Sequence, residues 1–599
     1  MKKNLTSKWA ASSALITLLA SACGSAGSSQ GQSAASLSCP AEAESHFVGT
    51  STTGGGQAAP KFKRLHGHIP RAVASASDGG KLDESKELPI TVSLELSDPT
   101  ALSREIVEIY RPGGAKFHQF LKPAEFHARF GPSQEQVRQV TDYLKQQGLQ
   151  AVSHDGGLLV HAIGTAAQLN AAFHTEIHQF QDAKGRSYHA PKSELEIPEN
   201  LAIQGVHGLQ SLTLAHNHLR TQASSPKSAT TRAATGPSGG FSPDDIRKAY
   251  NVPASLDGSG QSLALFELDG YSGSDITAYE SKFGLPATPL QDVLVDSASG
   301  GAGGGAGEVT LDIELMIALA PKASKILVYE GPNSDTGSLD VYAKIANDNL
   351  AQSVSSSWGS SEDSVSASFA QAENTIFMQM AAQGQTIYSA AGDSGANDNG
   401  SSLSIDDPSG QPYVVAVGGT ALSTDSSGAH QSETTWNDSS GGGGGGISTL
   451  WSIPSWQQGL ATSTNKASST MRNIPDVALN ADVNTGYSIY YGGGWSVWGG
   501  TSCSAPIWAA FNALINQQRA QNGAGPIGYI TPQLYSLGKG SGYGSAFFDI
   551  SDQSTNGFYP AVGGYDAATG WGSFNGEGLI AALSGGAKGG SDSGPSCGG

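Results

Sequence analysis

Short apolar runs alternate with longer segments of helical periodicity along the second half of the chain. The runs have the length and composition of buried strands: 262–268, 325–329, 354–358, 386–390 and 413–417. The segments between or beside them repeat apolar residues as helices do: 275–283, 308–320, 339–350 and 366–382. This order predicts an α/β fold in which a parallel sheet carries helices on both faces.

The first half of the chain has a different pattern, which predicts a separate α+β module over residues 88–223. Residues 88–96 alternate like a strand, and residues 133–147 are amphipathic. Residues 150–152 and 158–162 are typical of a hairpin. A short helix over 164–173 and a strand over 175–180 complete a ferredoxin-like plait.

Segments poor in apolar pattern separate and flank these two modules. Residues 1–22 are typical of an export signal: Lys2 and Lys3, an apolar stretch, then small residues before Cys23. Residues 23–87 are expected to form a tether, 224–240 an activation linker and 585–599 a disordered tail. Cys23 is either a lipid anchor of an exported lipoprotein or the first residue of a freely secreted protein. The four cysteines form no disulfide scaffold, and any pairing of Cys39 with Cys597 stays open.

Charge and histidine are distributed unevenly. The residues from 240 onward hold 33 Asp and Glu against 11 Lys and Arg, whereas the whole chain has 52 against 33. Thirteen of the 14 histidines lie between positions 46 and 218. A basic, histidine-rich half and an acidic half suggest an intramolecular partnership. The acidic half lacks basic stretches interleaved with aromatic residues, which argues against nucleic-acid binding.

The candidate nucleophile is Ser502, in the segment 499–506 of sequence GGTSCSAP. Paired glycines before a hydroxyl and an apolar helical run after it are typical of a serine at a tight turn into a helix N-terminus. Such a serine usually needs a histidine base, yet His430 is the only histidine from residue 240 onward and lies in a polar stretch. A carboxylate base, and therefore chemistry in acid, is the alternative that this pattern favours.

Three carboxylates are candidates to work with Ser502. Glu308 and Asp312 are four residues apart, so they share one face of the predicted helix, and their repulsion favours holding one protonated. Asp393 follows the strand 386–390, where open α/β sheets place their sites. Taken singly, an acid pair on a helix or a Gly-Asp-Ser-Gly turn is an ordinary structural feature. Their conjunction with the Ser502 segment is what predicts a site.

At these residues the chain resembles the sedolisins, the serine-carboxyl peptidases, and most closely their kumamolisin-like members. The resemblance implies a subtilisin-like fold with Ser502 as nucleophile, Glu308 as general base and Asp312 as its support. It also implies that Asp393 stabilises the oxyanion. Glu267 and Trp358 match the residues that extend the hydrogen-bond network in kumamolisin-like members. Cys503 and Ser504 depart from the small apolar residues that are commoner beside the nucleophile.

The same resemblance implies a zymogen and a metal site. Residues 113–121 match a segment of the family's inhibitory propeptide, which covers the active site, with activation cleavage in 224–240 and a catalytic domain over 241–584. One structural Ca²⁺ is expected on the carboxylates of Asp549 and Asp566 and the backbone oxygens of Ile550, Val562 and Gly564, which is a set of oxygen ligands suited to this hard cation. The glycine run 441–446 is expected to be a mobile loop.

The function predicted from the sequence is that of an exported, acid-active serine-carboxyl endopeptidase, made as a monomeric self-processing zymogen that cleaves peptides. A tripeptidyl-peptidase of the same family and a non-catalytic surface protein on the same scaffold are the alternatives. A neutral peptidase would require His430 as the base.

Overall fold

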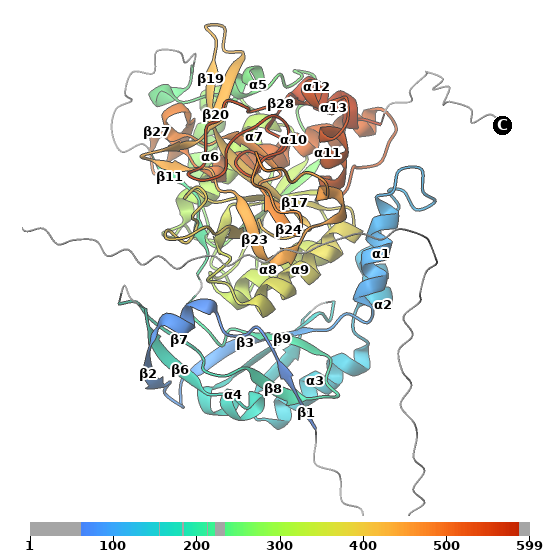
Figure 1. Cartoon of the computed structure of the whole chain (residues 1–599), viewed down its shortest axis with the longest axis vertical. Coiled ribbons are helices and arrows are strands. Elements are labelled where there is room, and N and C mark those ends of the chain that lie inside the picture. Colours follow the sequence, from blue (N-terminus) through green and yellow to red (C-terminus); the bar gives the residue numbers. More distant parts are fainter. Residues whose placement is uncertain (1–60, 155, 183–184, 213, 222–233, 586–599) are drawn as a thin grey trace, which may run out of the picture. The chain divides into compact units, whose positions relative to one another are not determined.

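The computed structural model describes residues 61–585, except 155, 183–184, 213 and 222–233 (Figure 1). The predicted export signal, Cys23, Cys39, Cys597, most of the activation linker and nearly all of the C-terminal tail lie outside the described residues. Within the described part of the chain, no helix combines the length and apolar character that crossing a membrane requires.

The second half of the chain folds around a mostly parallel sheet, as predicted. Its strands pair in the order β13-β14-β12-β15-β17-β19, with β25 parallel to β19 and β20 antiparallel at the edge. The bounds are β12 Ser262–Glu267, β13 Leu290–Leu294, β14 Lys325–Glu330, β15 Ser353–Ser356, β17 Thr386–Ala390, β19 Val414–Thr424, β20 His430–Thr435 and β25 Val477–Asn480.

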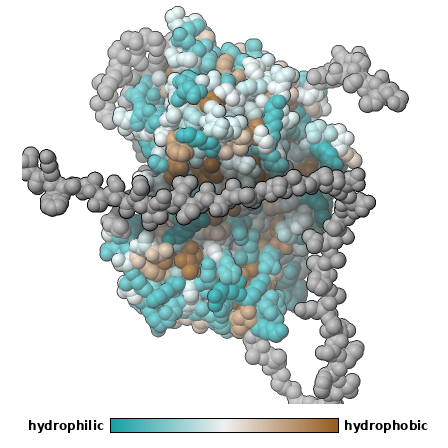
Figure 2. Space-filling view, in the orientation of Figure 1, coloured by the Kyte–Doolittle hydropathy of each residue, from teal (hydrophilic) through white to brown (hydrophobic). Residues whose placement is uncertain are grey.

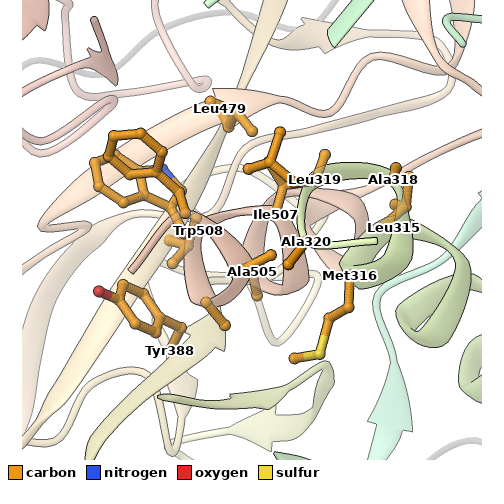
Figure 3. Packing of buried hydrophobic residues seen from close by; sticks show 14 of the residues in the cluster. Leu315, Met316, Ala318, Leu319, Ala320, Tyr388, Leu479, Ala505, Ile507 and Trp508 are labelled. Atoms are coloured by element: carbon orange, nitrogen blue, oxygen red, sulfur yellow. The ribbon is translucent and has the colours of Figure 1, made fainter. Parts of the chain in front are cut away.

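Helices cover both faces of this sheet because successive strand residues point to opposite sides. Leu263 and Leu265 of β12 lie in one core with α7 (Ala306–Leu319) and α10 (Thr501–Gln521). Figure 3 shows part of that core, where Ile507 and Trp508 of α10 cluster with Leu319 of α7. The intervening strand residues face a second core that includes α8 (Asp335–Asp348) and α9 (Ala367–Ala382). The predicted layers of helix, sheet and helix are confirmed. The helix α6 (Gly273–Phe283) also lies where the periodicity predicted a helix.

The prediction of a mobile loop over 441–446 is wrong. Gly441–Gly442 forms the short strand β22, and β23 (Gly446–Ser452) begins at the last glycine of the run. A Cβ on Gly444 would lie 1.8 Å from the carbonyl oxygen of Ala391, so backbone packs directly on backbone here. The glycines are present because of this close approach, which no side chain would permit.

The first half contains the predicted ferredoxin-like plait. Its antiparallel sheet has the order β4-β5-β3-β9, with bounds β3 Glu87–Leu94, β4 Gln150–Ser153, β5 Leu159–Thr165 and β9 Ile203–His207. The crossing helices are α3 (Gln134–Gln146) and α4 (Ala166–Phe173). The strand predicted over 175–180 is β6 (Ile177–Gln181), but it pairs in a separate sheet with β2 (Ser77–Lys81) and β7 (Ser187–Pro191). The fourth strand of the plait is therefore β9.

The predicted tether of residues 23–87 is too long, because regular structure lies within its described part, from residue 62 onward. The strand β1 (Phe62–Leu65) pairs with β8 (Leu195–Pro198), and the 3-10 helix η1 (Arg71–Ser75) leads into β2. The polar, glycine-containing sequence of β2 resembles a linker. Pairing with β6, about a hundred residues away along the chain, gives it its structure.

The plait and the large sheet share a hydrophobic core. Apolar residues of α1 (Pro99–Ile109) and α2 (Pro123–Phe130) belong to the same buried cluster as α8 and α9. Tyr110 donates its hydroxyl to the carbonyl oxygen of Ala381 at 2.8 Å, and the Leu121 N–H donates to Ala382 at 2.9 Å. On the face drawn in Figure 2, hydrophilic and neutral residues predominate and the hydrophobic ones form small patches.

Candidate active site

Ser502 is fully buried at the start of α10, as the sequence predicted. The preceding Gly500 has a φ of 103°, which favours glycine, and it has no room for a side chain. A Cβ on Gly500 would lie 2.0 Å from the carbonyl oxygen of His218 and 2.8 Å from Oδ2 of Asp393. The glycine therefore lets two groups from distant segments approach the helix N-terminus beside Ser502.

Glu308 and Asp312 lie on α7, and both side chains are fully buried. Burial, then the charge of Asp312, raises the pKa of Glu308 well above its usual range, while the hydroxyls of Ser502 and Ser357 lower it. The Ser502 hydroxyl thus acts on Glu308, although the pair makes no hydrogen bond of normal geometry. Such contacts often tighten only when substrate binds.

Buried hydrogen bonds lie next to Glu308 and Asp312. Ser357 Oγ donates to Asp312 Oδ1 at 2.9 Å, and Trp358 Nε1 donates to Glu267 Oε2 at 2.8 Å. Burial, then the charge of Glu267, raises the pKa of Asp312. Glu267 ends β12, and Ser357 lies between β15 and β16 (Trp358–Ser361), so neighbouring strand ends bring these residues together. Sequence reasoning missed Ser357, although it lies directly before Trp358.

Asp393 follows β17 and lies against the start of α10. Its Oδ1 accepts hydrogen bonds from Thr501, from the backbone N–H at 2.8 Å and from Oγ1 at 2.9 Å. Its Oδ2 has no hydrogen-bond partner among the described residues and lies on the Gly500 side, where the His218 carbonyl oxygen also lies. Burial raises the pKa of Asp393, and the charges of Arg220 and His218 oppose that rise. A protonated Asp393 would donate a hydrogen bond from Oδ2 toward the place where the His218 carbonyl oxygen lies.

A strand of the first half runs through the site. Its residues 216–217 (β10, His216–Asn217) pair antiparallel with β16, and residues 220–221 (β11, Arg220–Thr221) pair antiparallel with β27 (Gly494–Gly499). Between them, the carbonyl oxygen of His218 accepts from the Ser502 N–H at 3.3 Å. The peptide bond between His218 and Leu219 therefore lies at the candidate nucleophile.

Cleavage within the linker 224–240 stays a prediction, although the peptide bond at the nucleophile precedes that linker. The part of the propeptide at the site is the strand around His218. The segment 113–121 lies elsewhere, because His118 contacts Arg519 at the far end of α10, 3.2 Å from Nη2. Seventeen residues of helix separate Arg519 from Ser502, which is about 25 Å.

The side chain of His218 is buried in an acidic pocket that sequence reasoning missed. Its Nε2 lies 3.2 Å from Oδ2 of Asp406. Burial lowers the pKa of His218, and the charges of Asp393 and Asp398 oppose that lowering. Arg220, also missed, has its Nη1 3.6 Å from Asp393 Oδ2. Only pairing of the strand with the sheet edges brings these residues together, so no local spacing signals them.

His430 lies away from this network, at the start of β20. Its ring stacks on Phe548 with centroids 3.7 Å apart, and its Nε2 lies 3.3 Å from Oε2 of Glu433. Glu433 belongs to the edge strand β20 itself, and Phe548 packs against that strand. The contacts of His430 with them are those of a structural residue.

The predicted calcium ligands gather in one loop near the C-terminus. Asp549 Oδ1 accepts from the Gly564 N–H at 3.1 Å, and Asp566 Oδ2 accepts from the Val562 N–H at 2.9 Å. Burial raises the pKa of Asp566 to about 7. Among the residues described, no basic side chain pairs with either carboxylate, and no backbone N–H donates to the carbonyl oxygens of Ile550, Val562 or Gly564. Such unneutralised oxygens fit a Ca²⁺ ion.

Two family models match the chain. Residues 74–212 match the activation domain of pro-kumamolisin, and residues 301–532 match the subtilase family.

Whole-length relatives cover both modules. Kumamolisin of Bacillus sp. (strain MN-32) is 34% identical over 87% of this chain and 96% of its own length. Sedolisin of Pseudomonas sp. (strain 101) is 30% identical over 81% of this chain and 85% of its own. Tripeptidyl-peptidase 1 of Canis lupus familiaris is 27% identical over 84% and 93%. The solved structure of Pseudomonas sedolisin, a serine-carboxyl proteinase complexed with two molecules of pseudo-iodotyrostatin, is 30% identical with a TM-score of 0.52 and covers 59% of this chain and 98% of that one.

Proposed function

The chain belongs to the sedolisin family of serine peptidases and carries that family's activation propeptide, and from this premise we propose that it is an acid-active serine-carboxyl endopeptidase that processes itself. Its substrates are peptides, and its propeptide is an intramolecular inhibitor. In this proposal Ser502 is the nucleophile, Glu308 the general base, Asp312 its support and Asp393 the acid that stabilises the oxyanion.

The chemistry follows from these positions. Glu308 accepts the proton of Ser502 as Oγ attacks the peptide carbonyl, and it returns that proton to the leaving amine. Asp393 and the Ser502 N–H hold the negative oxygen, and water then hydrolyses the acyl-enzyme by the reverse use of Glu308. Attack needs Glu308 ionised and Asp393 protonated. Burial raises the pKa of both groups, which favours the protonated Asp393. For Glu308 the hydroxyls of Ser502 and Ser357 oppose that rise and so favour the ionised base.

One observation carries the proposal: the His218 carbonyl oxygen accepts a hydrogen bond from the Ser502 N–H, in a segment that pairs with β16 before His218 and with β27 after it. A strand so held has the geometry of a bound substrate. An intact nucleophile and base beside it argue against a non-catalytic surface protein.

The length of the bound strand favours an endopeptidase over a tripeptidyl-peptidase. Residues 216, 217 and 218 fill the three places before the bond at Ser502. Upstream of them, the Ala215 N–H donates to Asn333 Oδ1 at 3.0 Å, and Ser360 Oγ donates to the Leu214 carbonyl oxygen at 3.1 Å. A tripeptidyl-peptidase would accept three residues there, whereas this cleft binds at least five.

The proposal includes one structural Ca²⁺ held by Asp549 and Asp566 with the carbonyls of Ile550, Val562 and Gly564. That ion would neutralise the carboxylates and tie the loop to the domain. It also includes export of a monomer, either free or anchored at Cys23, in keeping with the sequence of residues 1–23.

Incubation of the purified precursor at pH about 4 and about 7 tests the proposal. The wild-type chain should process itself in acid, with a first product ending at His218 by intact-mass analysis. Ser502→Ala should stay intact under the same conditions. The proposal would be overturned if pure Ser502→Ala matured at the wild-type rate, or if no peptide bond of an added protein were cut internally by the wild type.

A further inference from the structure

Two histidines of the propeptide meet an aspartate of the catalytic domain, away from the active site. His154 follows β4 and His161 lies in β5, at the two sides of one hairpin, whereas Asp340 lies in α8. One ligand atom from each of the three residues lies within 4.8 Å of the other two. A second cluster of this kind, His216 with His218 and Asp406, belongs to the active-site strand already described.

The distances within the first cluster suit a small metal ion. Nδ1 of His161 lies 3.4 Å from Oδ2 of Asp340, and the rings of His154 and His161 have centroids 5.1 Å apart. Ligands about 2.0 Å from a tetrahedral ion lie about 3.3 Å from one another. The His161–Asp340 separation already has this value. His154, which is partly exposed, has a ligand atom within 4.8 Å of those of the other two residues.

The described residues supply neither a hydrogen bond nor a basic side chain to the buried carboxylate of Asp340. Its side chain is 1% exposed, and neither carboxylate oxygen has a hydrogen-bond partner of normal geometry among those residues. No Lys or Arg of the described chain forms an ion pair with it. A carboxylate buried without compensation is costly. A proton or a cation must therefore neutralise Asp340 in the folded precursor.

A simple ion pair between a protonated histidine and Asp340 explains the cluster poorly. One histidine would suffice for such a pair, whereas a ligand atom of each of the two imidazoles and of Asp340 lies within 4.8 Å of the others. Two neutral imidazoles and a carboxylate are instead the donor set typical of zinc. Asp296, which lies close enough to Asp340 to raise its pKa, offers a further oxygen.

We propose that His154, His161 and Asp340 bind one divalent transition-metal ion of the zinc type in the precursor, with Asp296 or water as the fourth ligand. Because two ligands come from the propeptide and one from α8, the ion joins the two modules across their interface. The site itself does not depend on the proposed catalytic function. Its disassembly on maturation does, since the ligands separate only if the propeptide leaves.

Metal binding to the Ser502→Ala precursor tests this site without any contribution from activity. The chain, without added histidines, is stripped with a chelator, dialysed at pH about 7 and titrated with Co²⁺, and Zn²⁺ then competes for the site. We expect one equivalent of Co²⁺ with the intense visible absorption of a tetrahedral site, displaced by Zn²⁺. His161→Ala should weaken binding at least about 100-fold, because loss of an outer-shell partner alone costs 10–100-fold.

His127→Ala is the matched control, because His127 also contacts α8, with Nε2 2.9 Å from Asn347 Oδ1, but lies outside the cluster. It should bind as the parent does. Asp340→Asn preserves shape and should also lose the ion, so a folding defect of His161→Ala, visible by circular dichroism, would not decide the result. Absence of a tetrahedral cobalt spectrum in the parent, or unchanged binding in both ligand variants, would overturn the proposal.

Discussion

At the scale of single residues, a carboxylate occupies the place where a serine nucleophile usually has a histidine. In the proposed mechanism Glu308 is the base, and the Ser502 hydroxyl lowers its pKa against the effect of burial, while His430 is engaged with Glu433 and Phe548. We therefore expect Glu308→Gln to lower kcat by about 10⁴-fold or more, the scale seen when a triad member is removed. His430→Ala should keep most of the activity. Turnover of a peptide at pH about 4 measures both, and equal losses would restore a histidine mechanism.

Asp393 should set the alkaline limit of activity. Its protonated form is the donor, so activity that depends on it is present below its raised pKa and is lost as pH rises through that value. In Asp393→Asn, the amide oxygen can still accept from Thr501 while the nitrogen takes the Oδ2 position and donates. We expect this variant to remain active to higher pH than the wild type.

Asp393→Ala is the companion variant, and its kcat should fall about 10²–10³-fold at every pH, as for loss of one oxyanion donor. Profiles of kcat against pH for the three proteins give the comparison. If activity of Asp393→Asn is lost at the same pH as that of the wild type, another group sets the alkaline limit.

The sequence predicted which residues would lie near one another where they belong to local motifs. The structure brings Glu308 and Asp312 to the Ser502 end of α10, with Asp393 against Thr501 and Trp358 bonded to Glu267. Ser357, Asp406 and Arg220 were missed, because their positions depend on which strands meet at the site. Hydrogen bonding between segments more than a hundred residues apart leaves no periodic signal.

At the scale of elements, the turn from β27 into α10 should tolerate no side chain at position 500. In Gly500→Ala, the new Cβ would meet the His218 carbonyl oxygen, and the backbone conformation, with a φ of 103°, would cost about 1–3 kcal/mol. We expect the precursor to melt a few degrees lower and to process at least about 100-fold more slowly, since small misplacements at a nucleophile cost this much.

Gly544→Ala is the matched control for that experiment. Gly544 lies in the short helix α12 (Tyr543–Ala546), and a Cβ there would meet no atom within 4 Å. Its melting temperature and processing rate should match the wild type. If Gly500→Ala is processed at the wild-type rate, processing does not require the close approach of the His218 carbonyl oxygen to position 500.

Whole elements were predictable in proportion to their burial and length. The strands of the parallel sheet are continuous apolar runs, so β12, β14 and β17 were found within one or two residues. Sheet partners were not predictable for β6, whose polar alternation fits either sheet of the propeptide. The sequence predicts a loop at 441–446 because glycines contribute nothing to a pattern of apolar positions. In the structure the segment packs closely because glycine has no side chain.

At the scale of the molecule, buried carboxylates should make the fold more stable in acid than at neutral pH. Burial raises the pKa values of Glu330, Asp335, Asp398 and Asp407 to about 7. Between pH about 4 and 7 the unfolded chain releases these protons while the folded chain keeps them, so stability is full below the unfolded pKa values and falls as pH rises. Above pH about 7 the loss is complete.

Melting of the Ser502→Ala precursor without added metal checks this expectation. Buried histidines with lowered pKa values, among them His68, His189 and His207, work in the opposite direction, so the test compares a variant with its parent at each pH. We expect Asp335→Asn to change the melting temperature more favourably at pH about 7.5 than at pH about 4, because a shift of one pKa unit in one buried group is worth about 1.4 kcal/mol. An equal change at both pH values would contradict the assigned direction.

Removal of calcium should lower stability before it affects chemistry. An ion bound only to the folded state stabilises it by about 2.7 kcal/mol at a hundredfold excess over Kd, so chelation at pH about 6 should lower the melting temperature by a few degrees. Asp549→Asn should melt low and no longer respond to Ca²⁺. Asp552→Asn, an exposed acid of the same loop, should respond as the wild type does. An unchanged wild-type melting temperature after verified metal removal would exclude a structural ion.

The hydrophobic core shared by the two modules has a consequence for the lifetime of the processed enzyme. Ile106 and Phe126 of the propeptide pack in one cluster with Phe377 and Met380 of α9. A mature domain without these partners occupies a state whose apolar face was covered when the chain first folded. Its persistence then depends on the height of the barrier to unfolding rather than on the depth of an equilibrium minimum. Unfolding of such an enzyme is irreversible, so its stability is measured as a half-life of activity at a given temperature.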